Sequence, residues 1–233
     1  MSTPANPSVP RRMRSYVIRA GRKTAAQQEA LDKHWGDYVI DDTQSPLDLA
    51  AVFGREAPLI IEIGFGMGDS LADMAEAAPG TNFLGIEVHR PGVGKLLNTL
   101  QTRGLSNVKV YCHDAVEILQ RCIADGSVDR VQIFFPDPWH KKRHHKRRLI
   151  QPPFVSLLKS KLKPGGSIHL ATDWQHYAEH MMAVLSADTD LTNLAGDGQY
   201  SDNTGRPETK FERRGQRLGH GVWDLIFELS PQN

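Results

Sequence analysis

The chain has 233 residues, 39% of them apolar, and its 28 Lys and Arg are matched by 27 Asp and Glu. This length accommodates one substantial α/β core and is too short for two cores of ordinary size. A net charge near zero excludes any inference about partners from total charge, so only the distribution of charge along the chain is informative.

Apolar runs and cysteines set two further expectations. No apolar run approaches the roughly 18 residues that cross a bilayer, and the N-terminal residues lack the apolar segment of a signal peptide, so we expect a cytoplasmic protein that does not bind a membrane. Cys112 and Cys122 are the only cysteines. Neither stands in a metal-binding spacing, and both are expected to be reduced thiols.

The N-terminal residues differ in composition from the rest of the chain. Residues 1–10 are rich in Pro, Ser and Asn, and residues 11–23 hold six Arg and Lys without an acid. Segments of this kind bury little apolar surface. We therefore expect residues 1–50 to form a basic arm and extension that is partly flexible, followed by a single domain over residues 51–233.

From residue 58 onward, short apolar runs alternate with helical segments. This order predicts parallel strands joined by crossover helices, because a parallel return needs a helix to cover the sheet. The predicted fold class is therefore α/β, a Rossmann-like, doubly wound and mostly parallel sheet. Strands are expected at 59–63, 82–88, 108–112, 129–135 and 167–172, and helices around 69–78, 91–103, 115–124, 150–162 and 175–186.

The C-terminal segment follows a different pattern. A stretch rich in Gly and Asp comes after the last predicted helix, and residues 211–229 then read FERRGQRLGHGVWDLIFEL. This sequence predicts two strands around a connection that contains glycine, antiparallel at the edge of the sheet.

A glycine-rich segment follows the first predicted strand. Gly64, Gly66 and Gly68 would let a ligand approach the backbone closely. A dinucleotide-binding loop requires GxGxxG, and Asp69 stands where its third glycine would be, which disfavours an NAD-dependent oxidoreductase. The spacing GxGxG instead resembles the first motif of the Rossmann-like methyltransferases that use S-adenosylmethionine (SAM), a ligand with cationic sulfonium and ammonium groups.

Four acids accompany the predicted strand ends. Glu62 lies in the first strand, Glu87 ends the second, Asp114 follows the third and Asp137 follows the fourth, at the edge where open α/β sheets bind ligands. Glu87 has the spacing of an acid that binds ribose hydroxyls, Asp114 would lie beside adenine, and Glu62 would lie near the methionine end. One acid at a strand end is often only a helix cap or a solvent ligand, so the prediction depends on all four.

The densest basic segment follows the fourth strand, where all nine residues from His140 to Arg148 are Lys, Arg or His. Such a run is often a solvated face, but its position beside the predicted pocket indicates a surface that holds nucleic acid by its phosphates. His140 and His144 have i,i+4 spacing. No Cys accompanies them, and the neighbouring cations oppose a metal ion, so no metal is expected.

This basic segment also carries a family resemblance. PDPWHKKRHHKRR (136–148), together with EIGFGMG, GIEVH, ATDW and TKFERRGQRLGHGVWDL, closely resembles the bacterial tRNA (guanine-N7)-methyltransferase family. The resemblance covers residues 58–229. It implies a SAM-dependent methyltransferase fold, SAM as cofactor, tRNA as partner, and a guanosine of the tRNA variable loop as target, at position 46 in standard tRNA numbering, giving 7-methylguanosine. Monomer and homodimer both remain open.

The resemblance also implies roles for individual residues. Asp137 corresponds to the proposed catalytic residue and belongs with Glu62, Glu87 and Asp114 among the SAM-binding acids, next to the glycine loop. The implied substrate-binding residues are Lys141, Asp173, Thr209, Lys210, Phe211 and Glu212, and the implied RNA-binding residues are Arg143, His144, His145, Lys146, Arg147 and Arg148.

Methylation at guanine N7 makes a limited demand on the protein. N7 already has an in-plane lone pair, so no proton has to be removed from the attacking atom and a general base is not obligatory. Asp137 could stabilise the positive charge that develops on the ring, or accept hydrogen bonds from guanine or from SAM. Trp139 and Trp174 could stack on an unstacked base, or they could be ordinary packing residues.

Two other functions have to be compared with this activity. A SAM methyltransferase for an exocyclic amine would resemble a pattern of Asp or Asn, two prolines and an aromatic residue, and Asp137-Pro138-Trp139 lacks the second proline. An RNA-binding protein that kept the fold and lost catalysis would share every motif and would lack the activity. A methylation assay on unmodified tRNA separates it from the enzyme.

Overall fold

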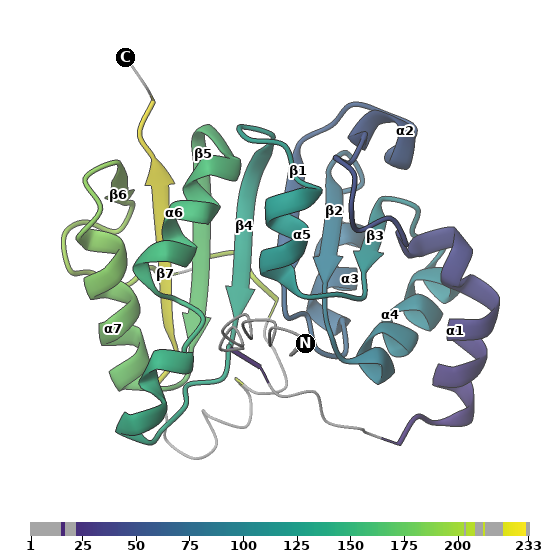
Figure 1. Cartoon of the computed structure of the whole chain (residues 1–233), viewed down its shortest axis with the longest axis horizontal. Coiled ribbons are helices and arrows are strands. Elements are labelled where there is room, and N and C mark those ends of the chain that lie inside the picture. Colours follow the sequence, from purple (N-terminus) through teal and green to yellow (C-terminus); the bar gives the residue numbers. More distant parts are fainter. Residues whose placement is uncertain (1–14, 17–21, 203, 208–211, 213–220, 232–233) are drawn as a thin grey trace, which may run out of the picture.

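The computed structural model of the chain describes residues 15–16, 22–202, 204–207, 212 and 221–231. Its centre is a seven-stranded sheet with the strand order β3-β2-β1-β4-β5-β7-β6 (Figure 1). The strands are β1 (Leu59–Ile63), β2 (Asn82–Ile86), β3 (Val108–Tyr111), β4 (Val128–Phe134), β5 (Leu162–Thr172), β6 (Leu191–Asn193) and β7 (Trp223–Leu229).

The pairing of the strands confirms the predicted fold class. The five strands from β1 to β5 are parallel to their neighbours, whereas β7 is antiparallel to β5 and to β6. In Figure 1, β4 and β5 accordingly point down and β7 points up. The carboxyl ends of the parallel strands therefore meet at one edge, and the order reverses between β1 and β4, which is where open α/β sheets bind ligands.

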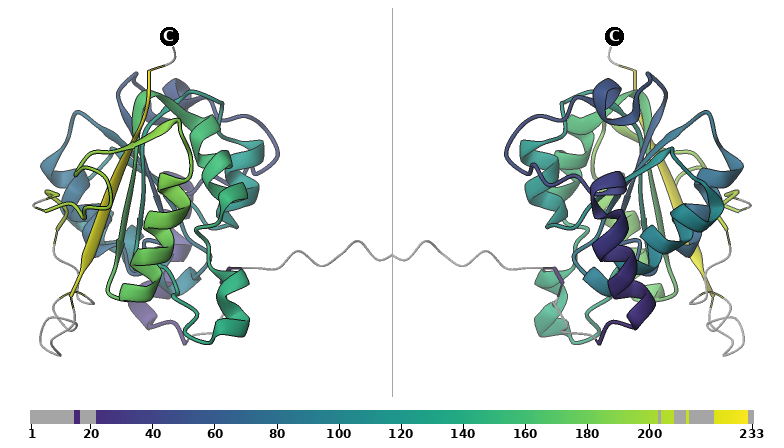
Figure 2. Two further views of the ribbon diagram at one scale, coloured as in Figure 1. Left: turned by 90° about the vertical axis from the view of Figure 1, so that its left-hand side faces the viewer. Right: turned by 90° about the vertical axis from the view of Figure 1, so that its right-hand side faces the viewer.

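Helices cover both faces of this sheet (Figure 2). On one face lie α5 (Ala115–Arg121), α6 (Pro152–Lys161) and α7 (Gln175–Ser186), which share a core cluster with β1, β4, β5 and β7. On the other face lie α3 (Asp69–Ala77), α4 (Arg90–Arg103) and α1 (Ala25–Tyr38), which enclose a second cluster. The short α2 (Leu49–Phe53) packs its apolar residues against the first cluster. None of the described helices has the length and apolarity needed to cross a bilayer.

Helix α1 lies in a segment for which the sequence analysis predicted no element. Its first turn is fixed by a capping box, in which Thr24 and Gln27 each accept a hydrogen bond from the other's backbone N–H. Leu31 is buried against α4, and a Cβ at Gly94 would lie 2.6 Å from the carbonyl oxygen of Gln27. Gly94 therefore allows the two helices to touch backbone to backbone, so part of the N-terminal extension packs on the core.

Several element boundaries differ from the sequence predictions, among them the following three. Strand β2 ends at Ile86, because the carboxylate of the following Glu87 binds the backbone N–H groups of Val88 and His89. Strand β5 starts at Leu162, where an irregular pairing with Val128 extends it across two glycines. Of the two C-terminal strands predicted, the second corresponds to β7. The first falls mostly on residues 211–220, which lie outside the described part except for residue 212, and β6 comes from a segment without a predicted strand.

Candidate active site

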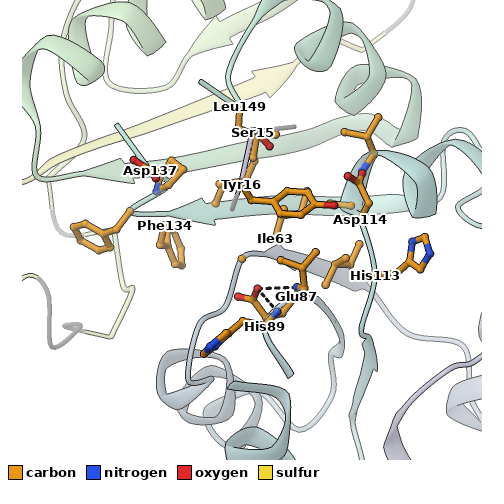
Figure 3. A pocket seen from close by; sticks show the side chains of 18 residues that line it. Ser15, Tyr16, Ile63, Glu87, His89, His113, Asp114, Phe134, Asp137 and Leu149 are labelled. Carbon is orange, nitrogen blue, oxygen red and sulfur yellow. Dashed lines mark hydrogen bonds between the residues drawn. The ribbon is translucent and has the colours of Figure 1, made fainter. Parts of the chain in front are cut away.

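A cavity of ≈ 410 Å³ opens at the carboxyl edge of the parallel strands, at the reversal of strand order (Figure 3). It brings together four of the residues predicted from the sequence. They are Gly64 after β1, Glu87 after β2, Asp114 after β3 and Asp137 after β4. We call the side formed by Gly64, Glu87 and Asp114 the cofactor wall, and we call residues 134–139, of which 134–137 line the cavity, the turn wall.

Glu87 organises the cofactor wall through its carboxylate. One oxygen accepts hydrogen bonds from the backbone N–H groups of Val88 (2.7 Å) and His89 (2.9 Å), and the other accepts from Gly66 (2.9 Å; Figure 3). These bonds tie the glycine loop to the end of β2. Each carboxylate oxygen has two lone pairs, so Glu87 keeps the capacity to accept from ribose hydroxyls as well.

The glycine loop uses a backbone conformation that favours glycine. Gly64, Gly66 and Gly68 have φ values of 78°, 58° and 77°. A Cβ at Gly68 would lie 2.7 Å from the side chain of Leu96, and a Cβ at Gly92 would lie 2.0 Å from the carbonyl oxygen of Gly66. The glycine spacing predicted the loop but gave no signal for Gly92, whose missing side chain lets α4 pack against the loop.

Asp114 combines the two roles that the sequence left open. One of its oxygens caps α5 by accepting from the backbone N–H groups of Val116 (2.9 Å) and Glu117 (3.3 Å). The same side chain lines the cavity. A helix cap holds the carboxylate in one orientation, so the capping bond fixes the direction in which the cavity presents an acceptor.

Among the predicted acids, Glu62 is the one that does not line the cavity, and of the loop glycines only Gly64 lines it. Glu62 is buried beneath the glycine loop and accepts a hydrogen bond of 3.0 Å from Gln132 on β4. Burial raises the pKa of Glu62 to about 7, with the nearby charge of Glu87 adding to the rise and the bond from Gln132 opposing it. From this position, Glu62 can support the glycine loop from below.

Asp137 belongs to the turn wall. Its side chain is exposed at the cavity, and one oxygen accepts a hydrogen bond of 3.1 Å from the backbone N–H of Trp139. Phe135 and Trp139, on either side of it, have positive φ values of 51° and 45° although neither is glycine. The turn that carries Asp137 is therefore irregular and strained, in contrast to the strand ends of the cofactor wall.

Two residues of the basic arm also line the cavity, which the sequence analysis did not predict. The backbone oxygen of Ser15 accepts a hydrogen bond of 3.0 Å from the Trp139 indole N–H. Figure 3 shows the Tyr16 ring extending across the cavity with its hydroxyl toward Asp114. The only available signal was an aromatic residue within a basic segment. The rest of the arm, residues 1–14 and 17–21, lies outside the described residues.

The basic run that follows the turn divides into two sets. Lys142, Arg143 and Lys146, here called the outer cations, are exposed on the 3₁₀ helix η1 (Lys142–Arg147). Arg147 and Arg148, here called the inner arginines, turn back toward the protein: Arg147 stacks 4.0 Å from the centre of the Trp139 ring, and Arg148 is 2% exposed. The run is therefore not one uniform surface.

Two histidines of the run, His144 and His145, are partly buried and carry little charge. Burial and the neighbouring cations lower the pKa of His144 and of His145 below the ordinary histidine value. Both imidazoles are therefore mostly neutral near pH 7. No group of three His, Cys, Asp or Glu residues in the described part of the chain is arranged to hold a metal ion.

Beside the cavity, a second hollow of ≈ 660 Å³ contains the predicted substrate residue Asp173. Trp174 forms part of its lining and packs edge-on against His140, with ring centres 4.3 Å apart. The predicted residue Lys141 is exposed between His140 and the outer cations. Thr209, Lys210 and Phe211 lie outside the described residues, so their predicted roles rest on the sequence alone.

Glu212, the remaining predicted substrate residue, is held by an arginine. Arg206 donates to both oxygens of Glu212 and binds Asp224 of β7 through two further bonds of 2.9 Å each. Its guanidinium also lies 5.6 Å from the ring centre of Phe134. Arg206 thus connects Glu212 to the turn wall.

Comparison with known proteins gives two results. Residues 56–225 match a family model described as "Putative methyltransferase". A tRNA (guanine-N(7)-)-methyltransferase of Alcanivorax borkumensis is 57% identical over 226 residues, which cover 97% of this chain and 95% of that protein.

Solved structures with low identity show the same fold. The 16S rRNA methyltransferase KamB superposes with a TM-score of 0.59 at 15% identity, covering 83% of this chain and 99% of that one. A SAM-dependent O-methyltransferase of Thermotoga maritima superposes with a TM-score of 0.51 at 15% identity, covering 78% and 63%. The architecture is that of a SAM-dependent methyltransferase, as the sequence predicted.

Proposed function

This chain belongs to the family of the tRNA (guanine-N(7)-)-methyltransferases, and on that premise we propose that it transfers a methyl group from SAM to N7 of a guanosine in the tRNA variable loop, at position 46, giving 7-methylguanosine. One observation carries the proposal within the structure: the cavity has a wall of acids at the glycine loop, and its opposite wall places Asp137 directly before the basic run.

The residues of the cofactor wall fit SAM. The cavity volume of ≈ 410 Å³ is within the range of roughly 300–1,000 Å³ usual for ligand sites. Ile63, Ile86 and Val116 provide an apolar lining for the adenine, whereas Glu87 and Asp114 provide acceptors for its hydroxyl and amino groups. A Cβ at Gly64 would meet nothing within 4 Å, so the loop leaves space beside the backbone.

Within this arrangement each acid has a separate task. Glu87 accepts from the ribose while it holds the glycine loop, and Asp114 accepts from the adenine amine while it caps α5. Glu62 supports the loop near the methionine end from its buried position. Bound SAM supplies an electrophilic methyl group, and the surrounding carboxylates favour its positive charge.

The turn wall and the basic run face the RNA. The outer cations, with His144 and His145 beside them, bind phosphates and hold the tRNA in register. Lys141, Asp173 and Glu212, together with the segment that begins at Thr209, contact the nucleotide to be modified. Trp174 borders the hollow next to the cavity and is the better placed of the two tryptophans to receive a base, because Arg147 already covers one face of Trp139.

Asp137 acts on the acceptor without removing a proton. N7 attacks with its own lone pair, so the protein has to orient the base and stabilise the positive charge of the methylated ring. Trp139 occupies one oxygen of Asp137 through its backbone N–H. That bond directs the other oxygen toward groups in the cavity, where a carboxylate lowers the energy of the developing cation.

The test is incubation of the protein with methyl-labelled SAM and unmodified tRNA, followed by digestion and nucleoside analysis. The expected product is labelled 7-methylguanosine, absent when the guanosine at position 46 is replaced by adenosine. Label in another nucleoside would assign a different acceptor. Tight binding of tRNA without any label would identify an RNA-binding protein that lacks the activity.

A further inference from the structure

The turn that carries Asp137 needs an external support. Phe135 and Trp139 both adopt the left-handed region of backbone conformation, which L-residues with side chains rarely occupy. Such a conformation persists only where the surrounding structure fixes it. Pro136 and Pro138 limit the flexibility of the residues between, but a proline lacks the N–H that could anchor the turn to a neighbouring strand.

Arg148 provides that anchor. Its Nε donates a hydrogen bond of 2.9 Å to the carbonyl oxygen of Pro138, the residue that follows Asp137. Its two terminal nitrogens donate to Nδ1 of His176 at 3.2 and 3.3 Å, and the guanidinium lies 4.7 Å from the ring centre of Tyr177. His176 and Tyr177 belong to α7, so one side chain joins the turn to a helix on the face of the sheet.

The surroundings of Arg148 differ from those of a phosphate-binding arginine. It is 2% exposed, and its charge faces a carbonyl oxygen, a ring nitrogen and an aromatic face. A buried cation is costly unless such partners replace water, so moving it outward to a phosphate would leave the carbonyl of Pro138 and the ring of Tyr177 without it. Because arginine only donates, Nδ1 of His176 must be unprotonated to accept from it.

The neighbouring Arg147 also supports the turn. It stacks on the indole of Trp139, the second left-handed residue, while the indole N–H is bonded to Ser15. Both inner arginines therefore contact the turn, one at its backbone and one at its terminal side chain. The outer cations on the same 3₁₀ helix are exposed instead.

We propose that Arg148 is a positioning residue, which holds the carbonyl of Pro138 and thereby fixes the Asp137 carboxylate at the cavity, and that it does not bind tRNA phosphate. The proposal rests on the proposed function, since the rate that Arg148 supports is that of methyl transfer. It assigns the last residue of the basic run to catalysis through Asp137, and leaves RNA binding to the exposed residues.

The experiment measures two properties of Arg148→Met and Arg148→Lys. The first is the single-turnover rate of methyl transfer at saturating SAM and tRNA, and the second is the tRNA dissociation constant over a range of salt concentrations. Arg148→Met is expected to lower the rate about 10- to 100-fold, as misplacement of a reacting group does, with the salt dependence of binding unchanged. Arg148→Lys, which can still donate to Pro138, should recover part of the rate.

Two comparison variants show how a residue without a role and a phosphate ligand would behave. Arg121→Met, at the exposed far end of α5, should change neither property. Lys146→Met should lower the slope of binding against salt by about 0.7–0.9, the effect of leaving one phosphate without its cation. If Arg148→Met behaves like Lys146→Met in salt dependence and keeps the wild-type rate at saturation, Arg148 is a phosphate ligand and the proposal is wrong.

Folding and the proposed function are controlled separately. Should Arg148→Met fail to fold, Arg148→Lys alone decides. A lowered rate at saturating SAM and tRNA with an unchanged salt slope supports positioning. A wild-type rate with a lowered salt slope contradicts it. A wild-type protein that transfers no methyl group to tRNA would overturn the proposed function. A normal rate in both Arg148 variants beside an active wild type would overturn only the positioning role.

Discussion

The two walls of the cavity are built by different means. The cofactor wall consists of strand ends, and its acids Glu87 and Asp114 bind backbone N–H groups within a few residues of themselves or in the adjacent loop. Beyond Phe134, which ends β4, the turn wall has no regular structure, and side chains from α7 and the basic run together with the backbone of Ser15 in the N-terminal arm hold it in place. A wall whose shape is fixed by its own backbone suits a ligand that is always the same. A wall assembled from distant residues can change its shape when a large ligand binds.

The largest expected effect comes from Asp137, at the centre of the turn wall. Asp137→Asn keeps an acceptor for the N–H of Trp139 but loses the charge, so we expect single-turnover methylation of tRNA to fall about 100-fold or more. The unfolding midpoint should not change, because the side chain is exposed. Asp202→Asn, another exposed acid, serves as the control. A rate near that of the wild type would remove Asp137 from the mechanism.

The next effect concerns the cofactor wall. Glu87→Gln places an amide where the carboxylate accepts from three backbone N–H groups, so one donor loses its acceptor. In the role proposed for Glu87, the ribose of SAM also loses a charged acceptor. Hydrogen bonds to charged groups contribute about 1.5–3 kcal/mol, which corresponds to a rise in the KM for SAM of about 10- to 100-fold. The KM for tRNA should not change. A variant that lost affinity for tRNA instead would contradict the division between the walls.

Removal of the outer cations should act on the RNA alone. In the triple variant Lys142→Ala, Arg143→Ala and Lys146→Ala, the slope of log affinity against log salt should fall by about 0.7–0.9 for each phosphate that is no longer neutralised. A matched triple variant, Arg103→Ala, Arg121→Ala and Lys163→Ala, removes the same charge at the opposite edge of the sheet and should leave the slope unchanged. Equal slopes in both variants would show that the run is only a solvated face.

Glu62 should have the smallest effect on methyl transfer and a clear effect on stability. Its folded pKa of about 7 lies above the ordinary value of 4.5, so the folded protein holds the proton more tightly than the unfolded chain does. Stability from this group is therefore complete below pH 4.5 and is lost as the pH rises to about 7, by about 3 kcal/mol at most.

Urea unfolding of the wild type and Glu62→Gln at pH 5 and pH 8 measures this contribution. The variant should gain stability relative to the wild type at pH 8, since an amide has no proton to lose. Parallel changes in the two proteins would show that Glu62 is ionised or solvated in the folded state. A loss of SAM affinity as large as that of Glu87→Gln would indicate that Glu62 contacts SAM directly.

The sequence predicted the cofactor wall better than the turn wall, for a physical reason. Regular alternation of strands and helices locates every strand end, so Gly64, Glu87 and Asp114 could be assigned to one edge in advance. The position of Asp137 followed in the same way. The left-handed Phe135 and Trp139 could not be predicted, because nothing local favours that conformation and its support comes from α7 and the arm.

The basic run shows the same limit. Its composition and position predicted an RNA surface, and the family resemblance assigned all the residues from Arg143 to Arg148 to RNA binding. Only tertiary contacts separate Arg148, on Tyr177 and the carbonyl of Pro138, from the exposed Lys146 two positions earlier. The position of Tyr16 at the cavity and the bonds between Arg206 and Asp224 are likewise products of long-range packing, for which the sequence carries no periodic signal.

The most direct test of the account is a crossed titration, in which calorimetry measures SAM binding and a filter assay measures tRNA binding for the same two proteins. We predict that Glu87→Gln weakens SAM binding and leaves tRNA binding at the wild-type level, and that the triple variant of the outer cations does the reverse. If both variants lose affinity for the same ligand, the two walls do not divide the cofactor and the RNA between them, and the account is wrong.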